Sequence, residues 1–449
     1  MLFGCVTADQ FLRGWRFALT FRQAAMIRLI EALNYRCLRY VHQPLDRFAV
    51  LVGANGSGKT TFLDVITFLG QLVSEGVEAA VWERTRNFQE LVWKQESSHF
   101  ELAVEAQAPE PLCACFGENG YNAIRYEVRV GIHSDTKEAA ILDERGLVKR
   151  AEGYQPRKPD VFPLLREPPD TILVGAGSTH RQGKHRTIFR KGPRGNDNFY
   201  SEVHHKTGKG WFPSIRLGPR KSALGNLPDD TTKFPIATWF RQLLIDGIQS
   251  LMLNSLALRR PSPPGQRRGF SADGSNLPWV VAQLEEPQHR SRLQQWVAHL
   301  QTALPDLVAV YTRERPEDRH RYLVLKYHGD LEVPSWLASD GTLRLLALTL
   351  PAYVPEMEGV YLVEEPENGI HPRAIETVFQ SLSSVYDAQI LLATHSPVIL
   401  SLAKPEQVLC FQKTEQGATD IVRGKEHPSL RDWRGKPDLS VLFASGVLG

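Results

Sequence analysis

Short apolar runs separated by amphipathic segments dominate the chain and predict an α/β protein. Continuous apolar runs at residues 48–52, 359–363 and 389–393 are typical of strands that a parallel sheet buries on both faces. Helical periodicity begins near residue 60, directly after the first run, and recurs between residues 235 and 305. The pattern therefore favours a parallel or mixed sheet covered by helices.

Alternation of apolar and polar residues marks a second kind of strand. It runs over residues 26–33, 100–105 and 126–130, and a period of two is typical of strands with one buried face. Residues 26–33 would open the fold, and the other two segments predict antiparallel strands. We therefore expect a second, antiparallel β subdomain in the first third of the chain.

The first 25 residues fit poorly with the strand that follows them. They contain Arg13, Arg16 and Arg22 with a single acid, Asp9. We expect that Met26 is the natural start and that residues 1–25 are an extension read from an upstream codon. A targeting peptide or an added helix is the alternative.

The composition is that of a globular protein with room for two or three domains. Of 449 residues, 42% are hydrophobic and 23% charged. Every apolar run is broken well before the roughly eighteen residues that a membrane span needs. The five cysteines are odd in number and scattered, without paired metal-site spacing. We therefore expect reduced thiols, a cytoplasmic location and no membrane contact.

A glycine-rich sequence directly follows the first apolar run. It reads Gly53-Ala54-Asn55-Gly56-Ser57-Gly58-Lys59-Thr60 and is called the phosphate loop below. Glycines let the backbone close on an anion, so that successive N–H groups and a helix N-terminus point at phosphates. We expect Lys59 to reach the β- and γ-phosphates of ATP and Thr60 to bind Mg²⁺. The residues predicted to bind the nucleotide are Gly53, Asn55, Gly56, Ser57, Gly58, Lys59, Thr60 and Thr61.

The other two apolar runs end in candidate catalytic residues. Glu364 and Glu365 follow residues 359–363, at the end of a strand expected beside the phosphate loop. We predict that Glu364 holds the hydration shell of Mg²⁺ and that Glu365 polarises the attacking water. The run at 389–393 ends in Thr394-His395-Ser396-Pro397. His395 at its tip would contact the γ-phosphate and hold the water in line.

A capped helix is predicted upstream of the acids. The turn Ser339-Asp340-Gly341-Thr342, called the signature turn below, precedes a periodic apolar run, and its hydroxyl and N–H groups make a second anion site. The order of phosphate loop, long intervening segment, signature turn, acidic strand and histidine resembles the ATP-binding-cassette (ABC) ATPases. This resemblance implies that Ser339 and Gly341 close over the γ-phosphate held by another subunit, in a head-to-tail dimer that sandwiches ATP. It also implies a glutamine that senses Mg²⁺, for which Gln89 and Gln95 are candidates.

More narrowly, the chain resembles ABC-type AAA family ATPases of the overcoming-lysogenisation-defect and RecF-like group. The sequences that carry this resemblance are Glu364-Glu365-Pro366-Glu367-Asn368-Gly369-Ile370-His371-Pro372 and Ser339-Asp340-Gly341-Thr342-Leu343-Arg344. Many members belong to bacterial antiviral-defence operons. Only about 50 residues follow His395, too few for the nuclease domain of overcoming-lysogenisation-defect proteins, so a nuclease would be a separate effector chain. Asp340 and Glu364 stand where transporter ATPases carry Gly and Asp, which argues against a transporter.

Positive charge is concentrated in one stretch. Between Gly153 and Gly225, fourteen Lys and Arg oppose five Asp and Glu, a net +9 in a chain of +3 overall. Aromatic residues such as Phe199 and Trp211 are interleaved with them. Basic side chains neutralise phosphates and aromatic rings stack on bases, so this basic stretch is a candidate DNA-binding surface. A solvated insertion and a docking face for an acidic partner are the alternatives.

The sequence predicts an ABC-ATPase head in four regions. These are the extension 1–25, a first ATPase lobe with phosphate loop and antiparallel strands at 26–150, a basic insertion with a helical subdomain at 151–330, and a second ATPase lobe at 331–449. The predicted function is an ATP-dependent switch that acts as a head dimer with a separate effector, in antiviral defence or DNA transactions. The rival hypothesis is a slow ATPase that holds an effector protein inactive without contacting DNA.

Overall fold

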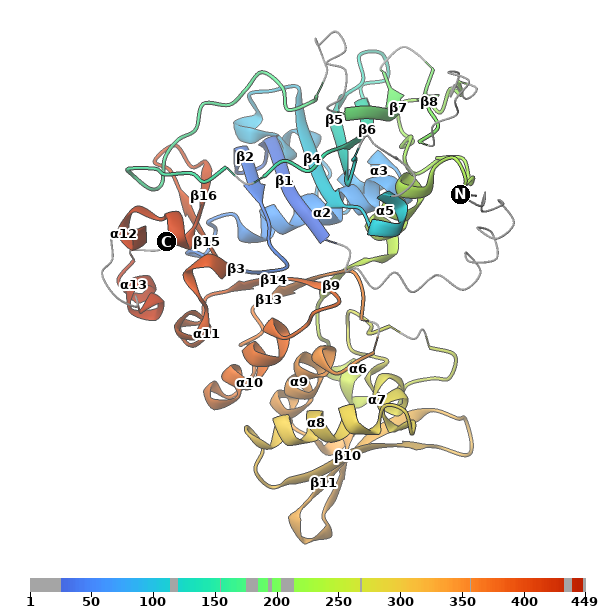
Figure 1. The fold of residues 1–449 in the computed structure, drawn as a ribbon, viewed down its shortest axis with the longest axis vertical. Coiled ribbons are helices and arrows are strands. Elements are labelled where there is room, and N and C mark those ends of the chain that lie inside the picture. Colours follow the sequence, from blue (N-terminus) through green and yellow to red (C-terminus); the bar gives the residue numbers. More distant parts are fainter. Residues whose placement is uncertain are drawn as a thin grey trace, which may run out of the picture.

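The computed structural model contains three β-sheets with helices packed around them (Figure 1). It describes residues 26–113, 120–153, 155–174, 185–192, 196–202, 214–266, 269–355, 357–431 and 438–446. The predicted extension, residues 1–25, lies outside the described residues. No helix among the described residues is both long and apolar enough to cross a membrane.

A six-stranded mixed sheet forms the centre of the molecule. Its strands, in spatial order, are β16 (Thr419–Arg423), β15 (Val408–Lys413), β3 (Phe48–Val52), β14 (Gln389–Thr394), β13 (Val360–Glu364) and β9 (Ile248–Leu251). Neighbouring strands are parallel except for β16, which pairs antiparallel with β15. The three apolar runs are thus β3, β13 and β14, as predicted. Because β14 lies between the other two, the carboxyl ends of all three meet at one edge of the sheet.

Alternate residues of the central strands contribute to two separate cores. Ala49 and Leu51 of β3 belong to one hydrophobic cluster, whereas Val50 and Val52 belong to the other, as the period of two in a strand requires. The helices in the first cluster include α2 (Lys59–Ser74), α3 (Val77–Trp82) and α5 (Pro235–Asp246). Those in the second include α9 (Asp340–Thr349), α10 (Pro372–Ser383) and α11 (Pro397–Leu402). Figure 1 shows α2 above the central sheet and α9 and α10 below it.

A seven-stranded antiparallel sheet packs over α2. Its order is β2 (Leu38–Pro44), β1 (Met26–Tyr35), β4 (His99–Gln107), β5 (Ala123–Ile132), β6 (Ala139–Lys149), β7 (His185–Lys191) and β8 (Asn198–Phe199). The alternating segments predicted as strands are β1, β4 and β5, which confirms the antiparallel subdomain. Strands β7 and β8 come from the basic stretch that we expected to be an insertion. They extend this sheet, so that part of the stretch belongs to the sheet itself.

A smaller lobe lies below the central sheet in Figure 1 and includes the signature turn. Its elements are α6 (Ser255–Arg259), α7 (Leu277–Glu285), α8 (Arg290–Gln301), β10 (Leu307–Glu314), β11 (Arg321–Tyr327), β12 (Glu332–Pro334), η4 (His328–Asp330), η5 (Ser335–Leu337), α9 and η6 (Leu350–Ala352). Helix α5, which we expected in the same helical subdomain, instead packs against α2. The three-stranded sheet β10–β12 was not predicted, because charged residues interrupt the alternation in its strands.

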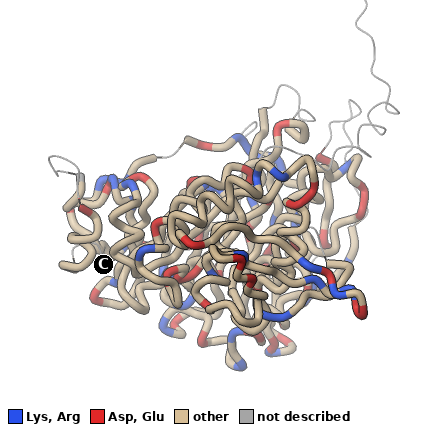
Figure 2. Tube along the Cα trace, turned by 90° about the horizontal axis from the view of Figure 1, so that it is seen from below, with Lys and Arg blue, Asp and Glu red and all other residues tan. Residues whose placement is uncertain are grey.

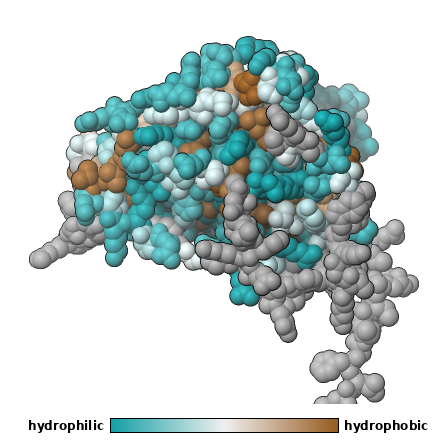
Figure 3. Space-filling view, turned by 90° about the horizontal axis from the view of Figure 1, so that it is seen from above, coloured by the Kyte–Doolittle hydropathy of each residue, from teal (hydrophilic) through white to brown (hydrophobic). Residues whose placement is uncertain are grey.

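The remaining short elements connect or flank these layers. They are η1 (Phe88–Leu91), η2 (Trp93–Gln95), α4 (Glu110–Cys113), η7 (Pro405–Gln407), η8 (Gly424–Glu426), α12 (Pro428–Arg431) and α13 (Leu439–Ala444). Polar residues cover most of the face seen from above in Figure 3, with small scattered apolar patches. On the face seen from below in Figure 2, Lys and Arg are interspersed with Asp and Glu.

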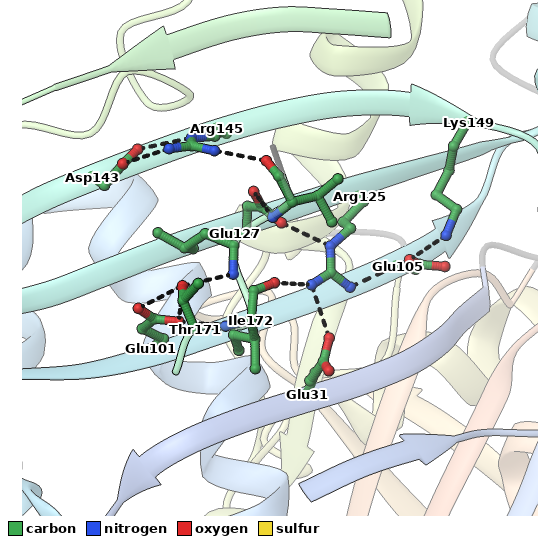
Figure 4. Close-up of polar contacts among 12 residues, drawn as sticks. Glu31, Glu101, Glu105, Arg125, Glu127, Asp143, Arg145, Lys149, Thr171 and Ile172 are labelled. Atoms are coloured by element: carbon green, nitrogen blue, oxygen red, sulfur yellow. Dashed lines mark hydrogen bonds and ion pairs between the residues drawn. The ribbon is translucent and has the colours of Figure 1, made fainter. Parts of the chain in front are cut away.

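A buried ionic network fastens residues 171–174 to the antiparallel sheet (Figure 4). The Arg125 guanidinium donates hydrogen bonds to Glu31, Glu127 and the carbonyl oxygen of Ile172, each at 2.8 Å. The backbone N–H of Ile172 in turn donates to Glu101 at 2.7 Å. Burying a charge is costly unless it is paired and hydrogen-bonded. The mutual pairing of these groups therefore allows them to remain in the interior.

Candidate nucleotide-binding and hydrolysis site

The phosphate loop closes between β3 and α2, as the sequence predicts. Gly58 has a φ of 107°, and a Cβ there would lie 2.3 Å from Oγ1 of Thr419 on β16. At Gly53 a Cβ would lie 2.2 Å from the carbonyl oxygen of Phe411. Only glycine tolerates both the left-handed backbone and such close approach. Thr419 also donates a hydrogen bond to the carbonyl oxygen of Ser57 at 2.8 Å, which holds the loop against the sheet.

Lys59 is folded back over the loop and is largely buried. Its Nζ donates to the carbonyl oxygens of Gly53 at 2.7 Å and Ala54 at 3.1 Å. Burial lowers the pKa of Lys59 to about 8, although the nearby carboxylates of Glu365 and Glu364 act in the opposite direction. The ammonium group is therefore available at the loop near neutral pH, in a site that disfavours its isolated charge.

The loop has the unsatisfied donors that a triphosphate would need. The N-terminus of α2 has no side-chain cap, and Oγ of Ser57 is buried without a hydrogen-bond partner among the described residues. A helix N-terminus attracts anions because its first N–H groups lack intrahelical partners. These groups, together with Lys59, fit the phosphates of ATP.

Thr60 and Glu364 meet across the edge of the sheet. Oγ1 of Thr60, in the first turn of α2, donates to Oε2 of Glu364 at the end of β13 over 2.5 Å. Hydroxyl and carboxylate oxygens are the ligands that Mg²⁺ prefers, often with water between protein and ion. The pair predicted as the magnesium site is thus brought together from positions 304 residues apart, and its donor set fits that ion.

Glu365 and His395 face each other beside this pair. Nε2 of His395 lies 3.6 Å from Oε1 of Glu365, and Asn368 donates to the other carboxylate oxygen at 2.5 Å. Glu365 has a φ of 48°, an uncommon conformation for a non-glycine residue that is concentrated at functional sites. Partial burial and the charge of Lys59 lower the pKa of His395. The imidazole is therefore biased towards its neutral form, which can accept a proton.

Two contributing residues were not assigned a role from the sequence. Glu367 accepts hydrogen bonds from Oγ1 of Thr394 at 2.7 Å and from the backbone N–H of His395 at 2.9 Å. Thr419 supports the loop from the far edge of the sheet. The motif that contains Glu367 could have indicated its importance, whereas Thr419 lies in an edge strand without any motif.

The signature turn caps α9 and is exposed. Oγ of Ser339 accepts a hydrogen bond from the N–H of Thr342 at 3.1 Å, as expected of an N-cap residue. Asp340 forms an ion pair with Arg259 of α6. A Cβ at Gly341 would lie 2.8 Å from the carbonyl oxygen of Gly369. The turn thus packs against the segment that follows β13, while α9 and α2 lie on opposite faces of the central sheet.

The two candidate glutamines have different surroundings. Gln95 lines a hollow of about 520 Å³ together with Gly56 and Thr61. Gln89 lies in η1, and its Oε1 is buried without a hydrogen-bond partner among the described residues. The geometry favours Gln95 over Gln89 as the residue near the nucleotide, and its role as a magnesium sensor remains a prediction. Asn55 is exposed in the phosphate loop, next to Gly56.

The phosphate loop, the acidic strand end and the histidine lie together where the parallel strands β3, β13 and β14 of the central sheet end. This arrangement defines a P-loop ATPase with an ABC-type head. The chain belongs to the family described as "AAA domain, putative AbiEii toxin, Type IV TA system", whose model matches residues 48–401. It is 23% identical over 435 residues to the OLD nuclease of Thermus scotoductus, a match that covers 93% of this chain and 68% of that protein.

Solved structures of SMC heads have a similar fold. The SMC head bound to the C-terminal winged-helix domain of ScpA aligns with a TM-score of 0.50 and 14% identity, over 88% of this chain and 96% of that one. A second SMC head, with an extended coiled coil and a ScpA domain from Pyrococcus furiosus, aligns with a TM-score of 0.45 and 13% identity, over 89% and 96%. The first of these likenesses supports the ABC-type head fold.

Proposed function

We propose that this ATPase is a switch that works as a head-to-tail dimer, in which binding and hydrolysis of ATP control a separate effector. The observation that carries the proposal is the meeting of Lys59, Thr60–Glu364 and Glu365–His395 at one edge of the central sheet. Lys59 and the uncapped end of α2 bind the phosphates, and Thr60 and Glu364 hold Mg²⁺, which supplies charge neutralisation when bound. Glu365 accepts a proton from the attacking water, and His395 orients it.

The exposed signature turn supports the dimer. Ser339 is exposed, and its hydroxyl accepts a hydrogen bond from the N–H of Thr342 at the N-terminus of α9, an end of a helix that attracts anions. Since α9 and α2 pack on opposite faces of the sheet, a second head is the natural source of the phosphates that this turn binds. Ser339 and Gly341 of one chain then complete the site that Lys59 of the other chain begins.

The effector and the biological setting rest on the relatives. The relative from Thermus scotoductus is by its name a nuclease, and the family description refers to a type IV toxin–antitoxin system. We therefore propose a cytoplasmic role in antiviral defence, with a nuclease or other effector as a separate protein. A slow ATPase that holds the effector inactive without DNA contact is the alternative form of the same switch.

A mixing experiment tests the shared site. Ser339→Arg should leave ATP binding by a single chain nearly unchanged, but a bulky cation at the turn should block closure and reduce hydrolysis at least about tenfold. Lys59→Ala instead removes the phosphate-loop half of the site and leaves the signature turn intact. Mixed Ser339→Arg and Lys59→Ala chains should regain activity, because one of the two sites in each heterodimer combines an intact turn with an intact phosphate loop.

The readout is the ATPase rate of the mixture compared with each variant alone, with heterodimers detected by two different affinity tags. Ser339→Ala is the matched control, since it removes the cap without adding bulk or charge. Heterodimers that form but remain as inactive as the separate variants would contradict sharing of sites between chains.

DNA binding is a second candidate function, favoured by three exposed cations of the basic stretch, two of them near the edge of the antiparallel sheet. Arg190 pairs in register with Asn198, and a bridge between Asp197 and Ile215 brings Arg216 beside the same strand. Arg190, Arg216 and Lys221 are exposed, and none has an ion-pair partner among the described residues. Guanidinium and ammonium groups left unpaired in this way are suited to a phosphate backbone.

Other cations of the basic stretch have internal roles. Lys191 is buried and forms an ion pair with Asp197 at 2.9 Å, Arg186 donates to the carbonyl oxygens of residues 201 and 202, and Arg220 is paired with Glu78 and Glu138. Reversing Lys191 would therefore disrupt the fold. Arg181, Lys184 and Arg194 lie outside the described residues.

The triple variant Arg190→Glu/Arg216→Glu/Lys221→Glu should weaken duplex DNA binding and flatten its salt dependence. Each lost phosphate contact reduces the slope of log affinity against log salt by about 0.9. The basal ATPase rate should stay within about twofold, because the nucleotide site lies elsewhere. Fluorescence anisotropy at several salt concentrations measures both quantities.

A matched reversal at Lys137, Arg290 and Lys404, which are also exposed, controls for overall charge. Equal losses of DNA affinity in the two triple variants would show that the effect comes from the net charge of the protein and not from this surface. An unchanged salt slope, together with release of a partner protein, would assign the surface to protein docking instead.

A further inference from the structure

Glu367 lies between the acidic strand end and the strand that carries His395. Its Oε1 accepts hydrogen bonds from Oγ1 of Thr394 and from the backbone N–H of His395. Its Oε2 is buried without a hydrogen-bond partner among the described residues. A carboxylate with one desolvated, unpaired oxygen is costly, and the two hydrogen bonds that Oε1 accepts offset part of that cost.

The contacts of Glu367 are part of a short chain of hydrogen bonds at the end of β14. Oγ1 of Thr394, fully buried, donates to Glu367 and accepts a hydrogen bond from the N–H of Ser396 at 2.9 Å. Ser396 then caps α11 by accepting from the N–H of Ile399 at 3.4 Å. These hydrogen bonds hold the backbone on both sides of His395, from which its imidazole ring projects.

Glu367 also lies in the same turn as Glu365. Asn368 donates to Glu365, and the N–H of Glu365 donates to the carbonyl oxygen of Ala393 at 2.8 Å. The turn after β13 and the end of β14 are therefore joined by two sets of hydrogen bonds. One connects Glu365 with Ala393, and the other connects Glu367 with Thr394 and His395. This arrangement sets the separation of 3.6 Å between His395 and Glu365.

We propose that Glu367 is a positioning residue for ATP hydrolysis: by holding Thr394 and the backbone of His395, it keeps the imidazole in register with Glu365. In this role Glu367 acts through His395 rather than as a ligand of the nucleotide. The inference rests on the role proposed above for His395. It goes beyond that proposal by giving Glu367 a role that differs from the Mg²⁺ binding of Glu364 and the proton transfer of Glu365.

The first test separates positioning from folding and from nucleotide binding. In Glu367→Ala, kcat should fall about 10- to 100-fold, because a displacement of about 1 Å in a catalytic group can cost that much. The KM for ATP should change less than about threefold, since the phosphate loop is intact. Glu367→Gln keeps an acceptor oxygen for both donors and should retain kcat within about threefold of the parent protein.

The second test asks whether Glu367 acts through His395. Glu367→Ala should cause no further loss in a His395→Ala background, because residues that act as a unit are not additive. Thr394→Val removes the hydroxyl donor and should reproduce the loss of kcat. Thr394→Ser keeps the hydroxyl and should retain the kcat of the parent protein. These two variants measure the same hydrogen bond if Glu367→Ala does not fold.

Glu376→Ala, an exposed change on α10, is the control and should leave kcat and KM unaltered. Full kcat in Glu367→Ala, equal losses in Glu367→Gln and Glu367→Ala, or independent losses from Glu367 and His395 would each overturn the inference. Normal turnover in His395→Ala would instead remove the role proposed for that histidine, and with it the basis of the inference.

Discussion

Replacing Glu365 with glutamine should reduce ATP hydrolysis about 10²- to 10⁴-fold, the usual contribution of a general base, while ATP still binds. Glutamine keeps the size of the side chain and can still contact Asn368, but it cannot accept the proton of the attacking water. Like glutamate, glutamine has a side chain at position 365, where φ is 48°. The substitution therefore does not change the backbone strain of the site. With hydrolysis blocked, ATP-bound heads should accumulate as closed dimers.

Single-turnover ATPase assays and size in solution with and without ATP measure the two parts of this prediction. Glu376→Gln is the matched control, because Glu376 is an exposed glutamate that accepts a hydrogen bond from Gln380 on the same helix. Turnover at the normal rate in Glu365→Gln would remove that residue from its assigned role. A variant that binds ATP and stays monomeric would count against the dimer and leave the catalytic assignment intact.

Replacing Lys59 with alanine should weaken ATP binding about 30- to several thousand-fold. Removing one partner of a buried, hydrogen-bonded charge pair typically costs about 2–5 kcal/mol, and Lys59 is the cation that the phosphate loop itself provides. The substitution also deprives the carbonyl oxygens of Gly53 and Ala54 of their donor. Hydrolysis and ATP-dependent dimerisation should be lost together with binding.

Isothermal titration with ATP and Mg²⁺ measures the dissociation constant directly. Lys158→Ala, which removes an exposed lysine far from the loop in sequence, should bind ATP like the parent protein. An affinity within threefold of the parent in Lys59→Ala would show that the phosphates are held elsewhere.

The arrangement proposed for the nucleotide site could be predicted from the sequence because its parts are local. The phosphate loop needs a strand, a glycine turn and a helix within about 25 residues, and each has its own pattern. Glu364, Glu365 and His395 were predictable for a similar reason, since each follows a buried apolar strand. Their meeting required only that the strands be parallel and adjacent, which continuous apolar runs already favour.

The remaining features depend on contacts between distant segments. The periodicity of α5 is that of any amphipathic helix, so it could not show that the apolar face packs on α2. Strands β7 and β8 were hidden by basic residues, among them Lys191, whose buried partner Asp197 is visible only in the folded chain. The role of Glu367 was hidden in the same way, because a glutamate after Glu-Glu-Pro has no periodicity that reveals its partners.

The close packing of Gly341 on Gly369 affects how variants of the signature turn are read. A methyl group at position 341 would collide with a backbone carbonyl of the same chain, so even alanine there must displace α9 or the turn after β13. Loss of activity on replacing Gly341 would therefore report on the internal architecture of one head as much as on its neighbour's nucleotide. Ser339 is exposed and its hydroxyl bonds to Thr342 of the same turn, so its substitution changes the helix cap without a collision with another segment.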